Sequence, residues 1–189
     1  MHDLSPTVLL ILGLFMIAAA AEHQESKWLF DFRKAERADA WPAVNDGVMG
    51  GISAGDSTIA NNALLFKGSL SLENNGGFSS VREAVNLDLV AYKGIRLRVK
   101  GDGRSYQLRL QTDSRFRDQP VSYSGSFDTK RNEWVEVDVP FSSLQQSFRG
   151  RNLSDFPFDP AKIELIGLLI ADNKPGPFTL EVEWIKAFR

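Results

Sequence analysis

The feature that most constrains the fold is a strict alternation of apolar and polar residues, which recurs in short runs along the chain. In residues 95–99 and 106–110, every second residue is large and apolar, and the residues between are Arg or Gln. Residues 121–127, 135–139 and 178–184 largely keep the same period. A period of two is typical of a β-strand with one buried face. The almost wholly apolar run 163–171 predicts a strand that is covered on both faces.

The connections between these runs are short and rich in turn residues. Gly101, Asp102 and Gly103 separate 95–99 from 106–110, which predicts a β-hairpin. No long stretch has a helical period, although 85–91 and 142–148 are each compatible with one or two turns of helix. Many short strands joined by such turns predict an all-β chain, specifically a jelly-roll β-sandwich.

The start of the chain has the pattern of a targeting segment. Residues 8–21 are small and apolar, end in four alanines and are followed by polar residues. This pattern is typical of a secretory signal peptide, and the run is shorter than the ~20 residues of a membrane span. We therefore expect a signal peptide at 1–21, a single β-sandwich domain at 22–189, and export to a periplasmic or extracellular location. An uncleaved leader, which would attach the chain to a membrane, is the alternative.

The numbers of Cys and His residues exclude several kinds of catalytic and metal-binding site. The chain has no Cys and only two His, which are His2 and His23. The chain therefore has no disulfide and no thiolate. His2 belongs to the expected signal peptide and His23 to the polar segment beside its cleavage site, so we expect neither a Ser-His-Asp triad nor a His-based zinc site in the folded domain. With 22 basic and 24 acidic residues, the net charge of −2 predicts no nucleic-acid partner. We predict a binding protein that is not an enzyme, with no catalytic residues, no metal and no cofactor.

Carboxylates leave two alternatives open. Glu181 and Glu183 share one strand face, so a hydrolase that uses carboxylates alone remains an alternative to two solvated surface acids. Calcium could be held by loop oxygens, although Asn and Asp in such loops are also ordinary turn formers. The candidate calcium ligands are Asn45, Asp46, Asp56, Asp102 and Asp113.

Three stretches are too particular to be turns alone: 41–53, 66–82 and 167–178. Together with 101–106 and 148–151, they resemble the complex I intermediate-associated protein 30 family, in order, from about residue 28 to 188. The resemblance implies a galactose-binding-domain-like jelly roll. It also implies a link to the assembly of respiratory complex I, in which members of the family act as chaperone-like factors and not as enzymes.

The polar residues of these stretches have two interpretations. Residues 45–47 and 74–77 are suited to turns with positive φ that pin the ends of the two sheets. Alternatively, the polar groups near them line a surface for a protein partner, either a respiratory-complex or an envelope component. The candidate partner-binding residues are Asn45, Asp46, Asn75, Arg82, Arg109, Asp113, Tyr123 and Asp172. A carbohydrate-binding module is the other function considered, with Trp41 and Tyr123 as the aromatic residues that would stack on a sugar.

The outward face of the expected hairpin is basic. It carries Arg96, Arg98, Lys100 and Arg109. These residues are either a solvated face whose long stems cover apolar surface or a docking patch for an acidic or sugar-bearing partner.

Overall fold

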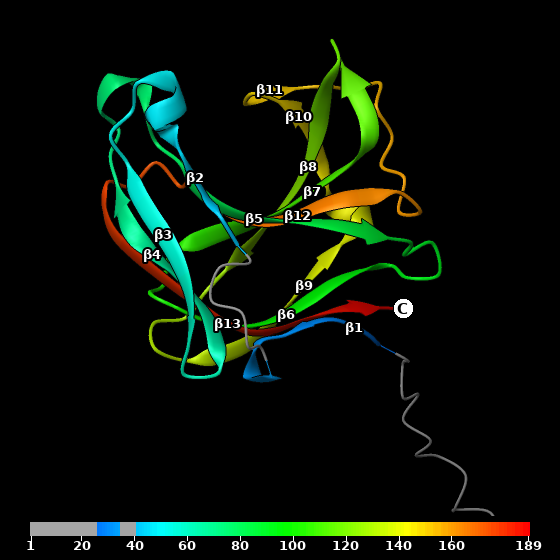
Figure 1. Cartoon of the computed structure of the whole chain (residues 1–189), viewed down its shortest axis with the longest axis horizontal. Helices are drawn as coiled ribbons and strands as arrows, with labels where there is room; N and C mark the ends of the chain where they lie inside the picture. The colour runs from blue at the N-terminus through cyan, green and yellow to red at the C-terminus, as the bar shows by residue number, and fades with distance from the viewer. Residues whose placement is uncertain (1–25, 35–40) are drawn as a thin grey trace, which may run out of the picture.

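The computed structural model describes residues 26–34 and 41–189, which form two packed antiparallel β-sheets (Figure 1). The strands of the six-stranded sheet are β1 (Lys27–Asp31), β3 (Ala54–Ala60), β4 (Ala63–Leu70), β6 (Gly94–Gly101), β9 (Trp134–Pro140) and β13 (Gly176–Phe188). Their order is β3-β4-β13-β6-β9, and β1 also pairs with β13. The predicted β-sandwich is confirmed.

The seven-stranded sheet has the order β11-β10-β8-β7-β12-β5-β2. Its strands are β2 (Ala43–Asn45), β5 (Ser79–Leu87), β7 (Ser105–Phe116), β8 (Gln119–Asp128), β10 (Gln145–Phe148), β11 (Arg151–Asn152) and β12 (Ile163–Ile170). β12 lies between β5 and β7, and seven of its eight residues are buried or half-buried. The prediction that this strand is covered on both faces is confirmed.

Helical structure in the described residues is limited to four short 3-10 helices. They are η2 (Phe32–Lys34), η3 (Asp46–Met49), η4 (Glu73–Asn75) and η5 (Phe141–Ser143). No helix in the described ranges is long and apolar enough to cross a membrane. The helical turns that the sequence allowed at 85–91 and 142–148 are for the most part not formed: β5 extends to Leu87, and η5 ends at Ser143, before β10 begins at Gln145. Pairing with β12 and β8 overrides a weak local helical pattern there.

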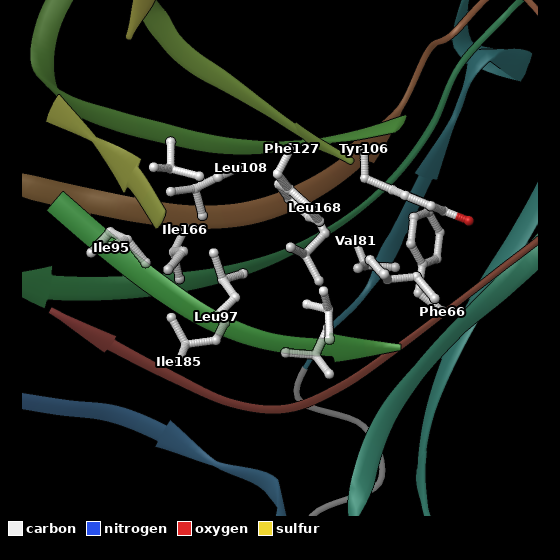
Figure 2. Close-up of a cluster of buried hydrophobic side chains, with 14 of the residues drawn as sticks. Phe66, Val81, Ile95, Leu97, Tyr106, Leu108, Phe127, Ile166, Leu168 and Ile185 are labelled. Carbon is white, nitrogen blue, oxygen red and sulfur yellow. The ribbon is translucent and has the colours of Figure 1, made fainter. Parts of the chain in front are cut away.

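The core lies between the central strands of the two sheets. Ile95 and Leu97 on β6 point toward Leu108 on β7 and toward Ile166 and Leu168 on β12 (Figure 2). Each of these five side chains is at most 1% exposed. Burying a side chain of this size stabilises the fold by about 1.5–3 kcal/mol. The alternation in the sequence therefore selects the residues that face this core.

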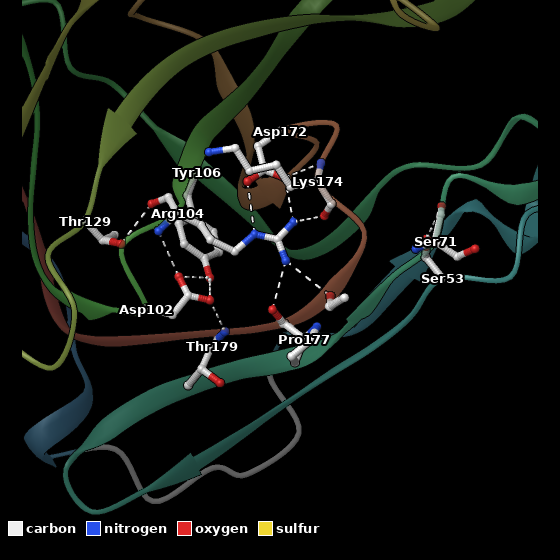
Figure 3. A network of polar contacts seen from close by, with 11 residues as sticks. Ser53, Ser71, Asp102, Arg104, Tyr106, Thr129, Asp172, Lys174, Pro177 and Thr179 are labelled. Atoms are coloured by element: carbon white, nitrogen blue, oxygen red, sulfur yellow. Dashed lines mark hydrogen bonds and ion pairs between the residues drawn. The ribbon is translucent and has the colours of Figure 1, made fainter.

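The hairpin expected at 95–110 is wrong, because β6 and β7 belong to different sheets. The turn between them carries the chain across the end of the sandwich (Figure 3). The carboxylate of Asp102 accepts hydrogen bonds there from the Tyr106 hydroxyl at 3.2 Å and from the Thr179 N–H at 2.9 Å. β6 and β7 bury their apolar residues in the same core from opposite sides. Each strand therefore alternates between apolar and polar residues, just as the two strands of a hairpin would.

Candidate functional site

The outer face of the six-stranded sheet is a network of ion pairs. Arg96 lies 2.6 Å from Asp138, Arg98 lies 2.8 Å from Glu183, and Lys100 lies 2.8 Å from Glu181. Three of the four positive charges expected to form a docking patch are thus compensated by cross-strand acids, which favours the solvated interpretation for those three. The same contacts occupy Glu181 and Glu183, the two acids of the hydrolase alternative. The fourth positive charge, Arg109, lies on β7 of the other sheet.

The outer face of the seven-stranded sheet is different, because most of its polar residues are uncharged. It forms a pocket of about 360 Å³. The walls are lined by Gln107 and Arg109 on β7, Ser124 and Ser126 on β8, and Gln145 and Ser147 on β10. Leu169 and Ala171, at the end of β12, also line the pocket. Such a concave surface with few charges is suited to binding and offers no paired acid and base for catalysis.

Two of the predicted site residues meet beside this pocket. In the register of the sheet, Gly167 on β12 lies opposite Arg82 on one side and Arg109 on the other. Ser124 lies opposite Arg109 on the next strand, and Gln145 lies opposite Ser124. Arg109 therefore lines the pocket, and Arg82 lies beyond Gly167 in the same row.

The two arginines share an electrostatic environment that is unusual in this protein. Burial lowers the pKa of the Arg109 guanidinium to about 10, and the positive charge of Arg82 acts in the same direction. Burial also lowers the pKa of Arg82. Their hydrogen bonds are to neutral hydroxyls: Arg82 Nε donates to Ser80 Oγ at 3.2 Å, and Arg109 Nε donates to Ser124 Oγ at 3.4 Å.

Asn45 and Asp46 have structural contacts. The Asn45 side chain exchanges two hydrogen bonds with the backbone of Gly55, at 3.0 and 3.1 Å, and so joins β2 to β3. The Asp46 carboxylate is fully buried and accepts hydrogen bonds from backbone N–H groups of Ser53 and Gly77, at 2.9 and 2.7 Å. Asp46 therefore holds two loops together and is not available to a partner.

The turn prediction is right for one loop and wrong for the other. Asn74, Asn75 and Gly77 have positive φ, as expected. In the other loop, the residue with positive φ is Gly50, whereas Asn45 is extended. Four large apolar side chains are nevertheless exposed in these two pinned loops: Val48, Met49, Ile52 and Leu72.

Asp172 belongs to a second structural network, at the end of the sandwich (Figure 3). Its carboxylate lies 2.6 Å from Arg104, and the two side chains are only 7% and 11% exposed. Arg104 also donates to the backbone carbonyls of Lys174, Gly176 and Pro177. These contacts fix the loop between β12 and β13, so Asp172 acts as a structural anchor.

The remaining predicted site residues do not join the pocket. Asp113 is an exposed partner of Lys162 at 2.9 Å. Tyr123 is 1% exposed and Trp41 is 3% exposed, so neither ring can stack on a sugar. Among the described residues, the large aromatic side chain that is exposed is instead that of Trp28 on β1, which lies under the ammonium of Lys186.

The candidate calcium ligands are scattered. Asp46, Asp102 and Asp113 lie in three different networks, and Asp56 caps the Ser57 N–H. Within the described ranges, no group of three His, Asp or Glu side chains could hold a metal ion. The turn-former interpretation fits Asp102, which accepts a hydrogen bond from the Arg104 N–H, but not Asp56 and Asp113, which lie within β3 and β7.

The pocket residues other than Arg109 were missed, although the sequence carried a signal for them. On β7 and β8, the residues between the core positions are Gln and Ser, whereas on β6 and β9 they are mostly Arg, Lys, Glu and Asp. An outward face of uncharged polar residues is the signal that could have identified the lining of the pocket.

The fold places the chain in the class of β-sandwiches represented by carbohydrate-binding modules. The family 11 module from Clostridium thermocellum, solved with a mixed-linked tetrasaccharide, has a TM-score of 0.67 at 18% identity, covering 86% of this chain and 95% of that one. A family 30 module has a TM-score of 0.57 at 15% identity, covering 87% and 99%. At such identities the likeness concerns the fold alone.

Residues 30–182 match the family model described as complex I intermediate-associated protein 30, and the chain belongs to this family. The mitochondrial complex I intermediate-associated protein 30 of Mus musculus is 29% identical over 87% of this chain and 57% of its own length. The Drosophila melanogaster protein of the same name is 24% identical, over 85% and 62%. The chain thus spans about three-fifths of the length of these relatives.

The relatives correct one expectation. Both are named as mitochondrial proteins, so the predicted export to a periplasmic or extracellular location is wrong. That prediction rested on the hydrophobicity and length of an apolar run, which do not by themselves determine the destination of a chain. The leader expected at 1–21 lies outside the described residues.

Proposed function

We propose that this protein is a non-enzymatic binding module that assists the assembly of respiratory complex I by holding a protein partner. The main support for this proposal is the match of residues 30–182 to the family model. Two surfaces support a binding role. One is the polar pocket, whose lining residues include a single charged side chain, that of Arg109, and the other is the pair of pinned loops that expose Val48 and Met49.

A domain exchange tests the proposal. In mouse cells that lack complex I intermediate-associated protein 30, the matching segment of the mouse protein is replaced by residues 26–189 of this chain. Native gel electrophoresis should show recovery of assembled complex I, with the unaltered mouse protein as the positive control. A chimera that accumulates in folded form without restoring complex I contradicts the proposal.

A carbohydrate-binding function is the second candidate, since the family 11 module, which shares this fold, was solved with a bound tetrasaccharide. The Ser and Gln side chains of the pocket could form hydrogen bonds with sugar hydroxyls. None of the described residues that line the pocket is aromatic, so this lining lacks the stacking surface that a sugar ring prefers. A glycan array probed with the full chain tests this candidate: saturable binding that Ser124→Val weakens supports it, and a blank array rejects it.

A further inference from the structure

Arg82, Gly167 and Arg109 form one row across β5, β12 and β7 at the side of the pocket. Their strands are neighbours, and adjacent strands lie about 4.8 Å apart. Two arginines on the same face of the sheet are thus separated at their backbones by only two strand spacings, with a residue between them that has no side chain.

Gly167 allows this arrangement. A Cβ atom at this position would lie 2.8 Å from the Val81 carbonyl oxygen and 3.2 Å from Cγ of Arg82. The stem of Arg82 therefore occupies the space beside Gly167 that a larger residue would fill. The absence of a side chain on β12 lets one arginine lie near the other.

The charges of this pair are uncompensated. Among the described residues, neither Arg82 nor Arg109 takes part in an ion pair, whereas Arg33, Arg96, Arg98, Arg104 and Arg115 all do. Two half-buried cations placed side by side repel one another and lose part of their hydration. A pair of this kind is costly in the free protein, and an anion would relieve the cost.

The surroundings indicate which anion fits. The Arg guanidinium is planar and matches the two oxygens of a carboxylate. The side-chain amides of Gln107 and Gln145 and the hydroxyls of Ser124 and Ser126 offer neutral donors and acceptors beside it. An extended peptide provides the matching groups, because its backbone amides lie between same-face side chains that repeat every ~7 Å. A free phosphate would bind the two guanidinium charges but would leave the side-chain amides of Gln107 and Gln145 without a partner.

We propose that Arg82 and Arg109 form a carboxylate-binding site that takes an acidic, extended segment of the protein partner. That the ligand belongs to a protein partner depends on the proposed function. That the ligand is an acidic peptide follows from the residues of the pocket and does not depend on that function. Acidic side chains would lie over the arginine pair, and the peptide backbone would lie along the Gln and Ser residues of β7, β8 and β10.

Isothermal titration of the full chain tests the site, with acetylated hexaglutamate as the probe and hexaglutamine as the neutral control. Arg109→Met and Arg82→Met keep the apolar stem and remove the charge. Each should weaken hexaglutamate binding by about tenfold or more, since hydrogen bonds to charged groups are the strong ones. Arg96→Met, which removes one charge from the opposite sheet, should leave binding within about twofold, as expected of a remote exposed charge.

The outcomes separate the possible ligands. Absent hexaglutamate binding, or equal binding by Arg109→Met and the unaltered chain, overturns the site. Tighter binding of inorganic phosphate than of hexaglutamate, or of oligogalacturonate than of either, overturns the acidic-peptide assignment in favour of that ligand. The domain-exchange assay keeps the two proposals apart: failure to restore complex I despite hexaglutamate binding rejects the proposed function and leaves the site in place.

Discussion

The carboxylate of Asp46 accepts a hydrogen bond from the backbone N–H of Gly77, 31 residues further along the chain, at 2.7 Å. The same carboxylate accepts from the N–H of Ser53 at 2.9 Å and from that of Phe78 at 3.3 Å. The glycines around it are also needed, because a Cβ at Gly51 would lie 2.4 Å from the Asp46 side chain. One buried charge thus determines the shape of both loops at this end of the sandwich.

Asp46→Asn should destabilise the fold by about 2–3 kcal/mol at pH 7, because an amide cannot accept all these bonds and leaves buried donors unpaired. Urea denaturation measures the loss. Asp113→Asn is the control: it removes an exposed carboxylate paired with Lys162, and it should change stability by less than 1 kcal/mol, as is typical of a surface pair.

The Asp46→Asn variant also tests how the stability contributed by Asp46 depends on pH. Burial acts to raise the pKa of Asp46, but the hydrogen bonds from Ser53, Gly77 and Phe78 outweigh it and hold the pKa below its ordinary value of 3.8. The contribution of a carboxyl with a depressed pKa is complete above the unfolded value and is lost as pH falls through the folded one. The stability difference between Asp46→Asn and the unaltered chain should therefore shrink below pH 3.8. A difference that stays constant down to pH 2 would contradict this role.

Arg104→Met should be the most damaging of the arginine substitutions. It leaves the almost fully buried Asp172 without its counter-ion and removes donors from three backbone carbonyls. Breaking such a pair costs about 3–5 kcal/mol. Arg96→Met breaks a pair whose side chains are 38% and 41% exposed, and it should cost less than about 1 kcal/mol. Thermal unfolding measures the loss of stability in each variant. Equal losses in Arg104→Met and Arg96→Met would show that the burial of an ion pair does not determine how much stability its removal costs.

Gly167→Ala tests the space between the two arginines. The added methyl group meets the Val81 carbonyl oxygen at 2.8 Å, and we expect a loss of about 1–3 kcal/mol from overpacking. Gly47→Ala is the control, because its Cβ would have no atom within 4 Å. It should change stability by less than about 0.5 kcal/mol. If both glycines tolerate alanine equally well, the close approach of the Arg82 stem is not important for the fold.

Arg109→Met should make the free protein more stable, which is the reverse of what removing a structural arginine does. The substitution relieves the repulsion between Arg82 and Arg109 and keeps the apolar stem. A gain of about 1 kcal/mol corresponds to a rise in melting temperature of about 2–4 °C for a chain of this size. A lower melting temperature would mean that the guanidinium mainly supports the fold.

The strands were predictable because burial on one side imposes a period of two. This period identifies the residues of β6 that face inward, such as Leu97, but not the sheet to which the strand belongs. That choice depends on pairing with distant strands: β6 pairs with β9 and β13, whereas β7 pairs with β8 and β12. The expected hairpin is wrong because a local pattern does not specify these partners.

The sequence identified some residues of the candidate site but not which of them lie next to one another. Arg82 and Arg109 were both named, yet they become neighbours only through the register of β12, which places Gly167 between them. Asp46 and Tyr123 were assigned to the surface because short polar residues and Tyr occur in both environments. Asp46 is buried by distant backbone groups, which local sequence patterns do not specify. Tyr123, in contrast, shares the buried parity of β8 with Val121 and Phe127, so the period of two was already a signal for its burial.

The position of β13 determines when the six-stranded sheet can form. This strand of 13 residues is hydrogen-bonded to β4 on one side and to β6 on the other, and it also pairs with β1. On the ribosome, β4 and β6 are made before residues 176–188, so their facing edges stay without partners until β13 has been made. The sheet closes only when β13 inserts between them, and in that interval the nascent chain carries unpaired strand edges that are prone to aggregation.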